Sequence, residues 1–452
     1  MSITFLDENN IKQGLGNDER SVISQKAMTD ILSEFTTNEK ARLSSTGDQT
    51  DRTSEIIGML TNYGVCYLDS GEFYVTQIDM PESSSIIGCG EGSVLVQVAR
   101  TDEVGGRAVI NLGNHCLISN VNILGQLRTR PTEIEINNPD YAIKLDIEGD
   151  VAQTCKIENT TIRGFSGAGI CVYDTGYGPL RSVLVSNVEI KNCGAGIYTG
   201  YHGEYGCYSN VICVDNYIGC YNNGGNNKFV GCGFDRNCYG LYMTSGDVNS
   251  SNNGHGTCTG CTFNHNVYSA IYAHTVVHGF IIDSCQMFHN GSIEYPSIHL
   301  LNSNGIVISD SEVSGNIKYP VIVKVEAVDG KYQNNTAILT SCLFHYLPQV
   351  YVGDRCTLQI DGCYMLDGTS ITRESLKTVH GNIIALQNFE SNKYEFTCSN
   401  STLEDLSTEI ITMCGKNLLK NIALDKTSQG ITFTKSNTGV SVVGTATENS
   451  FY

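Results

Sequence analysis

Three glycine-containing segments, at residues 173–179, 199–206 and 243–256, contain the acidic side chains best suited to chemistry, and the first two are also rich in tyrosine. Their carboxylates are Asp174, Glu204 and Asp247. Cleavage of a glycosidic bond needs two carboxyl groups, one acting as acid and the other as nucleophile or base. Side chains that could stack on or contact a sugar lie beside these acids, namely Tyr173, Tyr177, Tyr201, His202, Tyr205 and His255.

Glu204 is the best candidate for the general acid, because apolar neighbours such as its flanking aromatic residues raise the pKa of a carboxyl group. Asp174 or Asp247 would then supply the second carboxylate. Each segment follows a predicted strand in nearby repeats, so together they could form one lip of a groove roughly 15 Å long. The same residues also suit saccharide binding without cleavage, and acidic loops are common as plain solvated surface. All three readings stay open at this point.

A second group of polar residues ranks below this lip. Asp235 and Arg236 neighbour Asn264 and His265 in the next repeat, and His289 follows in the one after it. These residues could also have no role beyond structure, because they lie at the exposed end of a strand just before a corner.

The nineteen cysteines are an odd number and lack an accompanying histidine pattern for zinc. We expect them to be reduced residues of the core, because free cysteine behaves as a small buried hydrophobe. The sequence accordingly predicts no metal and no cofactor.

Composition excludes several classes of protein. Glycine is abundant (47), proline is scarce (7) and only 17% of residues are charged, which favours many tight turns over long helices. The net charge of −19 argues against nucleic acid or an anionic membrane as a partner. The N-terminus has neither the basic region nor the apolar stretch of a signal peptide, so synthesis in a cytoplasm is expected.

A strand-like repeat runs through the middle of the chain. Its last apolar residue, here called the anchor, recurs mostly at 21 to 31 residues, at Ile123, Ile162, Ile190, Cys213, Phe234, Phe263, Met287, Val313, Phe344 and Met365. Residues five before each anchor are apolar, and those two before it are small, five of them cysteine. Such alternation is typical of a strand with one buried face. Repeated at this interval, it predicts coils that stack like strands in one parallel sheet.

Three residues after the anchor, asparagine recurs in five consecutive repeats, at Asn216, Asn237, Asn266, Asn290 and Asn316. Asparagine tolerates the left-handed backbone region, so we expect these residues to form the corner itself and to stack as a ladder.

With these columns, the chain resembles the pectate-lyase-like superfamily. The resemblance implies an all-β fold, a right-handed single-stranded parallel β-helix with three strands per coil, over residues 51–414. The entry is similar too: a short helix at 51–60 leads into strands near 64–73 and 84–90, as in phage tailspikes and related β-helices that process polysaccharides. Motifs that would fix a pectin-specific activity are absent, apart from a lone Gly254-His255-Gly256.

The two ends resemble bacteriophage tail proteins. Residues 1–50, a short helical segment for attachment or trimerisation, contain Ser24-Gln-Lys-Ala-Met-Thr29, which is similar to a segment near the start of tail-fibre proteins. Met28, Ile31, Leu32 and Phe35 fall on one helical face and would need a partner, such as a trimer stem, or would cap the β-helix. Residues 415–452 resemble the start of a small C-terminal β-sandwich module that stops in mid-pattern.

Together these features predict a homotrimeric tailspike-like protein of the virion that binds a bacterial surface polysaccharide and cleaves it. The N-terminal segment would attach to the phage tail or baseplate. A non-catalytic receptor-binding fibre and a purely structural β-helix are the alternatives.

Overall fold

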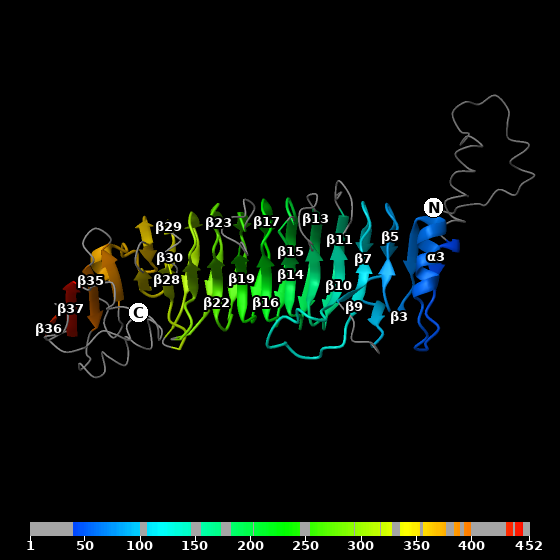
Figure 1. Ribbon diagram of the computed structural model, residues 1–452, viewed down its shortest axis with the longest axis horizontal. Coiled ribbons are helices and arrows are strands. Elements are labelled where there is room, and N and C mark those ends of the chain that lie inside the picture. The colour runs from blue at the N-terminus through cyan, green and yellow to red at the C-terminus, as the bar shows by residue number, and fades with distance from the viewer. Residues whose placement is uncertain are drawn as a thin grey trace, which may run out of the picture.

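The computed structural model is a long stack of β-strand coils, with the chain running from one end of the stack to the other (Figure 1). It describes residues 39–99, 106–145, 155–172, 182–201, 203–244, 254–292, 294–316, 318–327, 335–352 and 356–376, together with the late strands β34 (Ile384–Asn388), β35 (Lys393–Cys398), β36 (Ile431–Ser436) and β37 (Gly439–Thr445). The helical face predicted around Met28 lies outside these residues.

A short helix closes the N-terminal end of the stack. Helix α3 (Thr53–Tyr63) buries Ile56 and Leu60 and ends at Gly64, which is left-handed at φ 70°. The chain then enters β2 (Val65–Leu68) and β3 (Gly71–Val75), as expected from the sequence. Parallel pairing already begins ahead of the helix, because β1 (Arg42–Leu43) pairs with β2.

Each coil contributes strands to two long sheets that face each other across the core. Sheet A continues with β5 (Ser85–Ile87), β6 (Ser93–Gln97), β8 (Leu117–Ser119), β9 (Asn122–Leu124), β11 (Cys155–Arg163), β13 (Val183–Lys191), β15 (Cys207–Val214), β17 (Asn227–Val230), β18 (Gly233–Asp235), β20 (Gly256–Thr259), β21 (Thr262–Asn264), β23 (Phe280–Asp283), β24 (Gln286–Phe288), β26 (Ile306–Ser309), β27 (Glu312–Ser314), β29 (Asn335–Thr340), β30 (Leu343–Phe344), β32 (Cys356–Asp361) and β33 (Tyr364–Met365).

Sheet B runs alongside and is also parallel from its first strand to β31. Its strands are β4 (Ile78–Asp79), β7 (Arg107–Asn111), β10 (Asp140–Leu145), β12 (Ala168–Val172), β14 (Ala195–Thr199), β16 (Ile218–Asn222), β19 (Tyr239–Thr244), β22 (Ser269–His274), β25 (Ile298–Leu301), β28 (Ile322–Glu326) and β31 (Gln349–Val352). After the short helix α4 (Arg373–Leu376), β34 pairs with β31, and antiparallel pairing begins between β34 and β35.

No helix among the described residues is long and apolar enough to cross a bilayer.

The predicted register is confirmed in sheet A from β9 to β33. All ten anchors pair in order, from Ile123 with Ile162 to Phe344 with Met365. Nine of them are buried, and Met365 packs against the core from its edge. The chain therefore forms the stacked parallel coils that the repeat predicted and the right-handed parallel β-helix that the resemblance implied.

Sheet A bends in the middle of each coil at a left-handed residue three before the anchor, for example Asn210, Gly231 or Gly260. The bend turns the next N–H away from the ordinary backbone ladder. Instead, the N–H of Cys232 donates to Cys261 Sγ at 3.2 Å, and that of Cys261 donates to Cys285 Sγ at 3.4 Å. These three thiols are free and buried, so the cysteine column was predicted correctly and also has a hydrogen-bonding reason.

The asparagine column was only partly predicted correctly. The left-handed corner residues are the ones just before it, including Arg236 (φ 53°) and His265 (φ 56°), and not the asparagines. Asn266 is buried, where its Oδ1 accepts the N–H of Asn237 at 3.0 Å and its Nδ2 donates to the carbonyl of Phe234 at 2.8 Å. The amides thus satisfy backbone groups that the turn leaves unpaired. Asn316 is exposed and lies outside this ladder.

One connection is unusually long. Residues 125–139, here called the strap, leave β9, run along one edge of the stack and return to β10 (Figure 1). The strap crosses the corners of several later coils before it turns back, as its hydrogen bonds to Gly164, Asn192 and Arg236 show.

Candidate functional site

Four members of the predicted groove lip lie within the described residues: Tyr201, Glu204, Tyr205 and His255. Glu204 is buried, with 3% of its surface exposed, and its Oε2 accepts a hydrogen bond from Asn226 Nδ2 at 3.2 Å. Tyr205 is exposed and Tyr201 is half-buried. The other predicted members lie outside the described residues, namely Tyr173, Asp174, Tyr177, His202 and Asp247. The pairing of Glu204 with a second carboxylate therefore stays a prediction.

His255 is the lip residue that the structure does bring to Glu204. Burial lowers the pKa of the His255 imidazole, and the nearby charge of Glu204 opposes that effect. Among the described residues, His255 Nδ1 has no hydrogen-bond partner. A Cβ atom at Gly225 would lie 2.3 Å from His255 Cε1, so glycine there is what leaves room for the ring.

Asn227 holds the backbone beneath this pair. It is fully buried, its Oδ1 accepts the N–H of Gly206 at 2.9 Å, and its Nδ2 donates to the carbonyl of Gly203 at 2.9 Å. The segment that carries Glu204 is thus fixed by a neighbouring coil.

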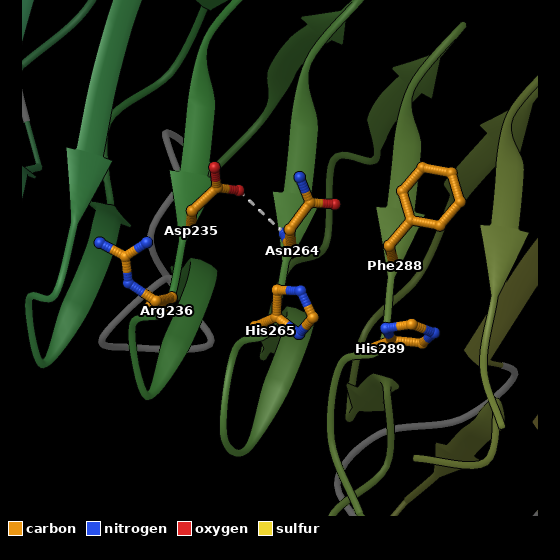
Figure 2. Close-up of a pocket in the computed structure, with 6 residues that line it drawn as sticks. All are labelled: Asp235, Arg236, Asn264, His265, Phe288 and His289. Atoms are coloured by element: carbon orange, nitrogen blue, oxygen red, sulfur yellow. Dashed lines mark hydrogen bonds between the residues drawn. The ribbon is translucent and has the colours of Figure 1, made fainter. Parts of the chain in front are cut away.

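The second predicted group forms an open hollow, here called the corner groove, with a cavity volume of about 350 Å³. Figure 2 shows that three consecutive coils each supply two residues to it: Asp235 and Arg236, then Asn264 and His265, then Phe288 and His289. The first of each pair ends strand β18, β21 or β24, and the second is the left-handed corner residue. The left-handed turn therefore brings two adjacent side chains to the same hollow.

The two aspartates at this corner differ in electrostatic environment. Burial raises the pKa of Asp235, although the N–H of Asn264 donates to its carboxylate at 3.0 Å. Hydrogen bonds from Arg236 at 2.9 and 3.0 Å and an ion pair with Lys191 at 3.2 Å lower the pKa of Asp215 on the preceding coil. The pKa values of the two carboxyl groups are thus shifted in opposite directions.

The imidazoles complete the chemistry of the corner groove. Burial lowers the pKa of His289, and the neighbouring His265 and His345 lower it further. The rings of His265 and His289 stand 5.3 Å apart. A carboxyl group whose pKa is raised, a carboxylate held by positive charge and an imidazole whose pKa is lowered are groups that acid–base catalysis on a sugar could use.

A row of tyrosines on the outer face of sheet B was missed from the sequence. Tyr198, Tyr221, Tyr242 and Tyr272 occupy one register column, with ring centroids 4.7 to 5.3 Å apart. The signal was an apolar residue followed by tyrosine in each successive strand of sheet B. Because the first two pairs of rings stack almost parallel, they cover each other's faces and present their edges outward. This row is thus poorly suited to stacking on sugar rings.

Three buried thiols lie close together in the core. The Sγ atoms of Cys258, Cys261 and Cys285 lie within 4.8 Å of one another, and the first two have a C-x-x-C spacing that was missed from the sequence. Cys261 Sγ also lies 3.6 Å from the carbonyl of Phe229, and Cys285 Sγ lies 3.6 Å from that of Cys258. Burial raises the pKa of Cys258 well above its usual range. The hydrogen bonding of sheet A accounts for this cluster.

Comparison with known proteins agrees with the fold. Residues 145–295 match the family model described as a right-handed β-helix region. No curated protein is significantly similar to the chain in sequence.

Three solved structures match the chain at low identity and with TM-scores below 0.5. Tailspike protein 2 of the Escherichia coli O157:H7 bacteriophage CAB120 is 13% identical with a TM-score of 0.45, and the match covers 79% of this chain and 53% of that one. A surface adhesin of Streptococcus pneumoniae is 10% identical with a TM-score of 0.42, covering 77% and 96%. A GH87 α-1,3-glucanase of Streptomyces thermodiastaticus is 13% identical with a TM-score of 0.42, covering 74% and 70%. This chain thus spans about half the length of that tailspike, and the likeness does not extend to activity or substrate.

Proposed function

We propose that this chain is a bacteriophage tail protein that binds a bacterial surface polysaccharide along its β-helix and cleaves it in the corner groove. The observation that carries the proposal is the groove itself, where Asp235, His265 and His289 come from three successive coils and open to solvent. Three coils at about 4.8 Å each give the groove a length suited to a chain-like ligand. The phage assignment rests on the resemblance of residues 24–29 and 415–452 to tail proteins.

The proposed reaction is hydrolysis of a glycosidic bond. Asp235 donates its proton to the oxygen of the leaving sugar as the bond from that oxygen to the anomeric carbon breaks. A water molecule adds to that carbon and gives its proton to a carboxylate, a role that fits Asp215 because Arg236 and Lys191 favour its ionised form. The opposite pKa shifts of the two groups suit these two roles, because such a reaction needs one acid and one base.

The lip around Glu204 is a second candidate for the catalytic centre. What favours it is the contact of a buried carboxylate with Asn226 and the nearby His255, whose Nδ1 has no partner among the described residues. Asp174 or Asp247 would act as its second carboxylate, with Tyr173, Tyr177, Tyr201, His202 and Tyr205 binding the sugar.

Binding without cleavage is the alternative function. Asp215 already accepts hydrogen bonds from Arg236 and lies 3.2 Å from Lys191, which would have to yield before it could activate water. A receptor-binding fibre would use the same groove and leave the polysaccharide intact.

The test is to incubate the purified full chain with surface polysaccharide from phage-susceptible bacteria and to measure new reducing ends. Asp235→Asn should abolish cleavage and keep binding, because the amide retains shape but cannot donate the proton in the same way. Glu204→Gln tests the lip in the same assay. Asp283→Asn is the matched control, since Asp283 is an outward carboxylate of a neighbouring coil that accepts a hydrogen bond from Ser309 at 2.6 Å.

Each outcome assigns one function. Loss of cleavage in Asp235→Asn alone supports the corner groove, and loss in Glu204→Gln alone moves the reaction to the lip. Binding without new reducing ends supports the receptor-binding fibre, and no binding leaves a structural β-helix. Light scattering of the full chain tests the proposed homotrimer, which a monomer would contradict.

A further inference from the structure

The strap ends its outward run beside the corner groove. Hydrogen bonds fix its course at three corners. The N–H of Leu127 donates to the carbonyl of Gly164 at 3.0 Å, and Asn192 Nδ2 donates to the carbonyl of Arg128 at 3.0 Å. Arg130 Nη1 donates to the carbonyl of Arg236 at 2.7 Å. From the coil of Ile123 to that of Phe234 is four steps of the stack, or roughly 19 Å.

The strap forms one wall of a second hollow, here called the cationic cleft, with a cavity volume of about 530 Å³. Arg128 and Arg130 come from the strap and are exposed, while Lys191 and Arg236 come from the coil corners. Arg236 and His265 line this cleft and the corner groove alike, so the two hollows are continuous.

Charge distinguishes this cleft from the rest of the chain. The protein has a net charge of −19, yet four basic side chains converge here. Asp215 is the one acidic residue that lines the cleft, and it pairs with two of the four, Lys191 and Arg236. A positive cleft in a negative protein raises the local concentration of anions at the cleft.

Arginine is also the side chain best fitted to an acidic group. Its planar guanidinium carries five donors, and two of them can bind one carboxylate in parallel. Arg130 has one short contact with the carbonyl of Arg236, which positions its guanidinium at the cleft and uses one donor direction.

We infer that the cationic cleft binds the anionic group of an acidic saccharide, so that the polysaccharide of the corner groove carries carboxylates or acidic esters. The inference rests on the proposed function only in that a saccharide occupies the corner groove. Arg128 and Arg130 hold one acidic sugar while its neighbour in the glycan lies over Asp235, His265 and His289.

The test measures binding of the full chain to polygalacturonate, dextran sulfate and neutral dextran at 50 and 300 mM NaCl. We expect at least one of the acidic polymers to bind tenfold or more tightly than dextran at low salt, with most of that preference lost at high salt. Arg128→Gln with Arg130→Gln should weaken that binding about tenfold. The control Arg42→Gln with Lys228→Gln removes two exposed positive charges elsewhere and should change binding less than twofold.

Polygalacturonate and dextran sulfate separate the two sources of negative charge, since the first carries carboxylates and the second sulfate esters. Equal binding of all three polymers, or an equal loss in both double variants, overturns the inference. Binding of polysaccharide from susceptible bacteria is measured separately, because it tests the proposed function. If this polysaccharide binds wild type and Arg128→Gln/Arg130→Gln equally well, the cationic cleft is not its binding site. The proposed function then stands. If this polysaccharide fails to bind the wild type, the proposed function falls.

Discussion

A charged cluster on sheet B, centred on Glu326, lies next to the end of the tyrosine row. In the column after Tyr272 come His299 and Lys324, and Glu326 contacts both: His299 Nε2 lies 2.6 Å from Oε1, and Lys324 Nζ lies 2.8 Å from Oε2. Glu326 is only 7% exposed. We predict that Glu326→Gln destabilises the chain strongly at neutral pH, because it leaves Lys324 without its buried counter-ion.

The magnitude follows from the pKa of Glu326. Burial alone would raise it, but the hydrogen bond with His299 and the charge of Lys324 outweigh burial and lower the pKa from 4.5 to about 2. One unit of pKa corresponds to about 1.4 kcal/mol, so the carboxylate contributes on the order of 3 kcal/mol. Because the folded-state pKa is the lower one, this stability is fully present above about pH 4.5 and is lost as the pH falls towards 2.

The assay is urea or thermal unfolding of wild type and Glu326→Gln at pH 7 and at pH 3. We expect a loss of about 3 kcal/mol at pH 7 and less than half of that loss, about 1.4 kcal/mol, at pH 3. Glu189→Gln is the control, because Glu189 pairs with Arg163 at 3.2 Å while both side chains are more than 40% exposed. Such an exposed pair should contribute about 1 kcal/mol or less. A loss for Glu326→Gln that is the same at both pH values, or no larger than that of the control, would refute the reasoning.

Three further predictions concern the core and its thiols. Asn266→Ala leaves the N–H of Asn237 and the carbonyl of Phe234 without these partners, so the free energy of unfolding should fall by about 3 kcal/mol in urea titration. Gly240→Ala places a Cβ atom 2.6 Å from a neighbouring carbonyl, which should lower the melting temperature by several degrees. In a thiol titration of the native chain, the exposed Cys89 should react at once, and the buried thiols only after unfolding.

The coils of sheet A could be predicted because each one repeats the same local pattern. Positions five and two before the anchor have no freedom to face outward, so apolar residues such as Phe229 and small ones such as Cys232 recur regardless of the loops between them. The role of the asparagines was harder to predict. Asparagine suits both a left-handed corner and a buried amide ladder, and only the neighbouring coil decides which one Asn237 adopts.

The sites were less predictable, because they depend on contacts between coils. The sequence suggested apolar neighbours for Glu204, yet Asn226 from another coil donates a hydrogen bond to its carboxylate. The groove at Asp235 was seen as a secondary patch, and its opposed pKa values follow from burial and from Arg236. The contact of Arg130 with Arg236 spans 106 residues, and no local pattern predicts such a contact.

The strap also has a mechanical consequence. In a stack of coils each coil contacts only its neighbours, so an end can unravel one coil at a time. The strap joins the coil of Ile123 directly to that of Phe234, through contacts at Asn192 and Arg236. A force pulling on the N-terminal end must therefore detach these contacts before the coils between them can separate. The coils from Ile123 to Phe234 should therefore resist unfolding as one unit. The coils beyond Phe234 can still unfold one at a time.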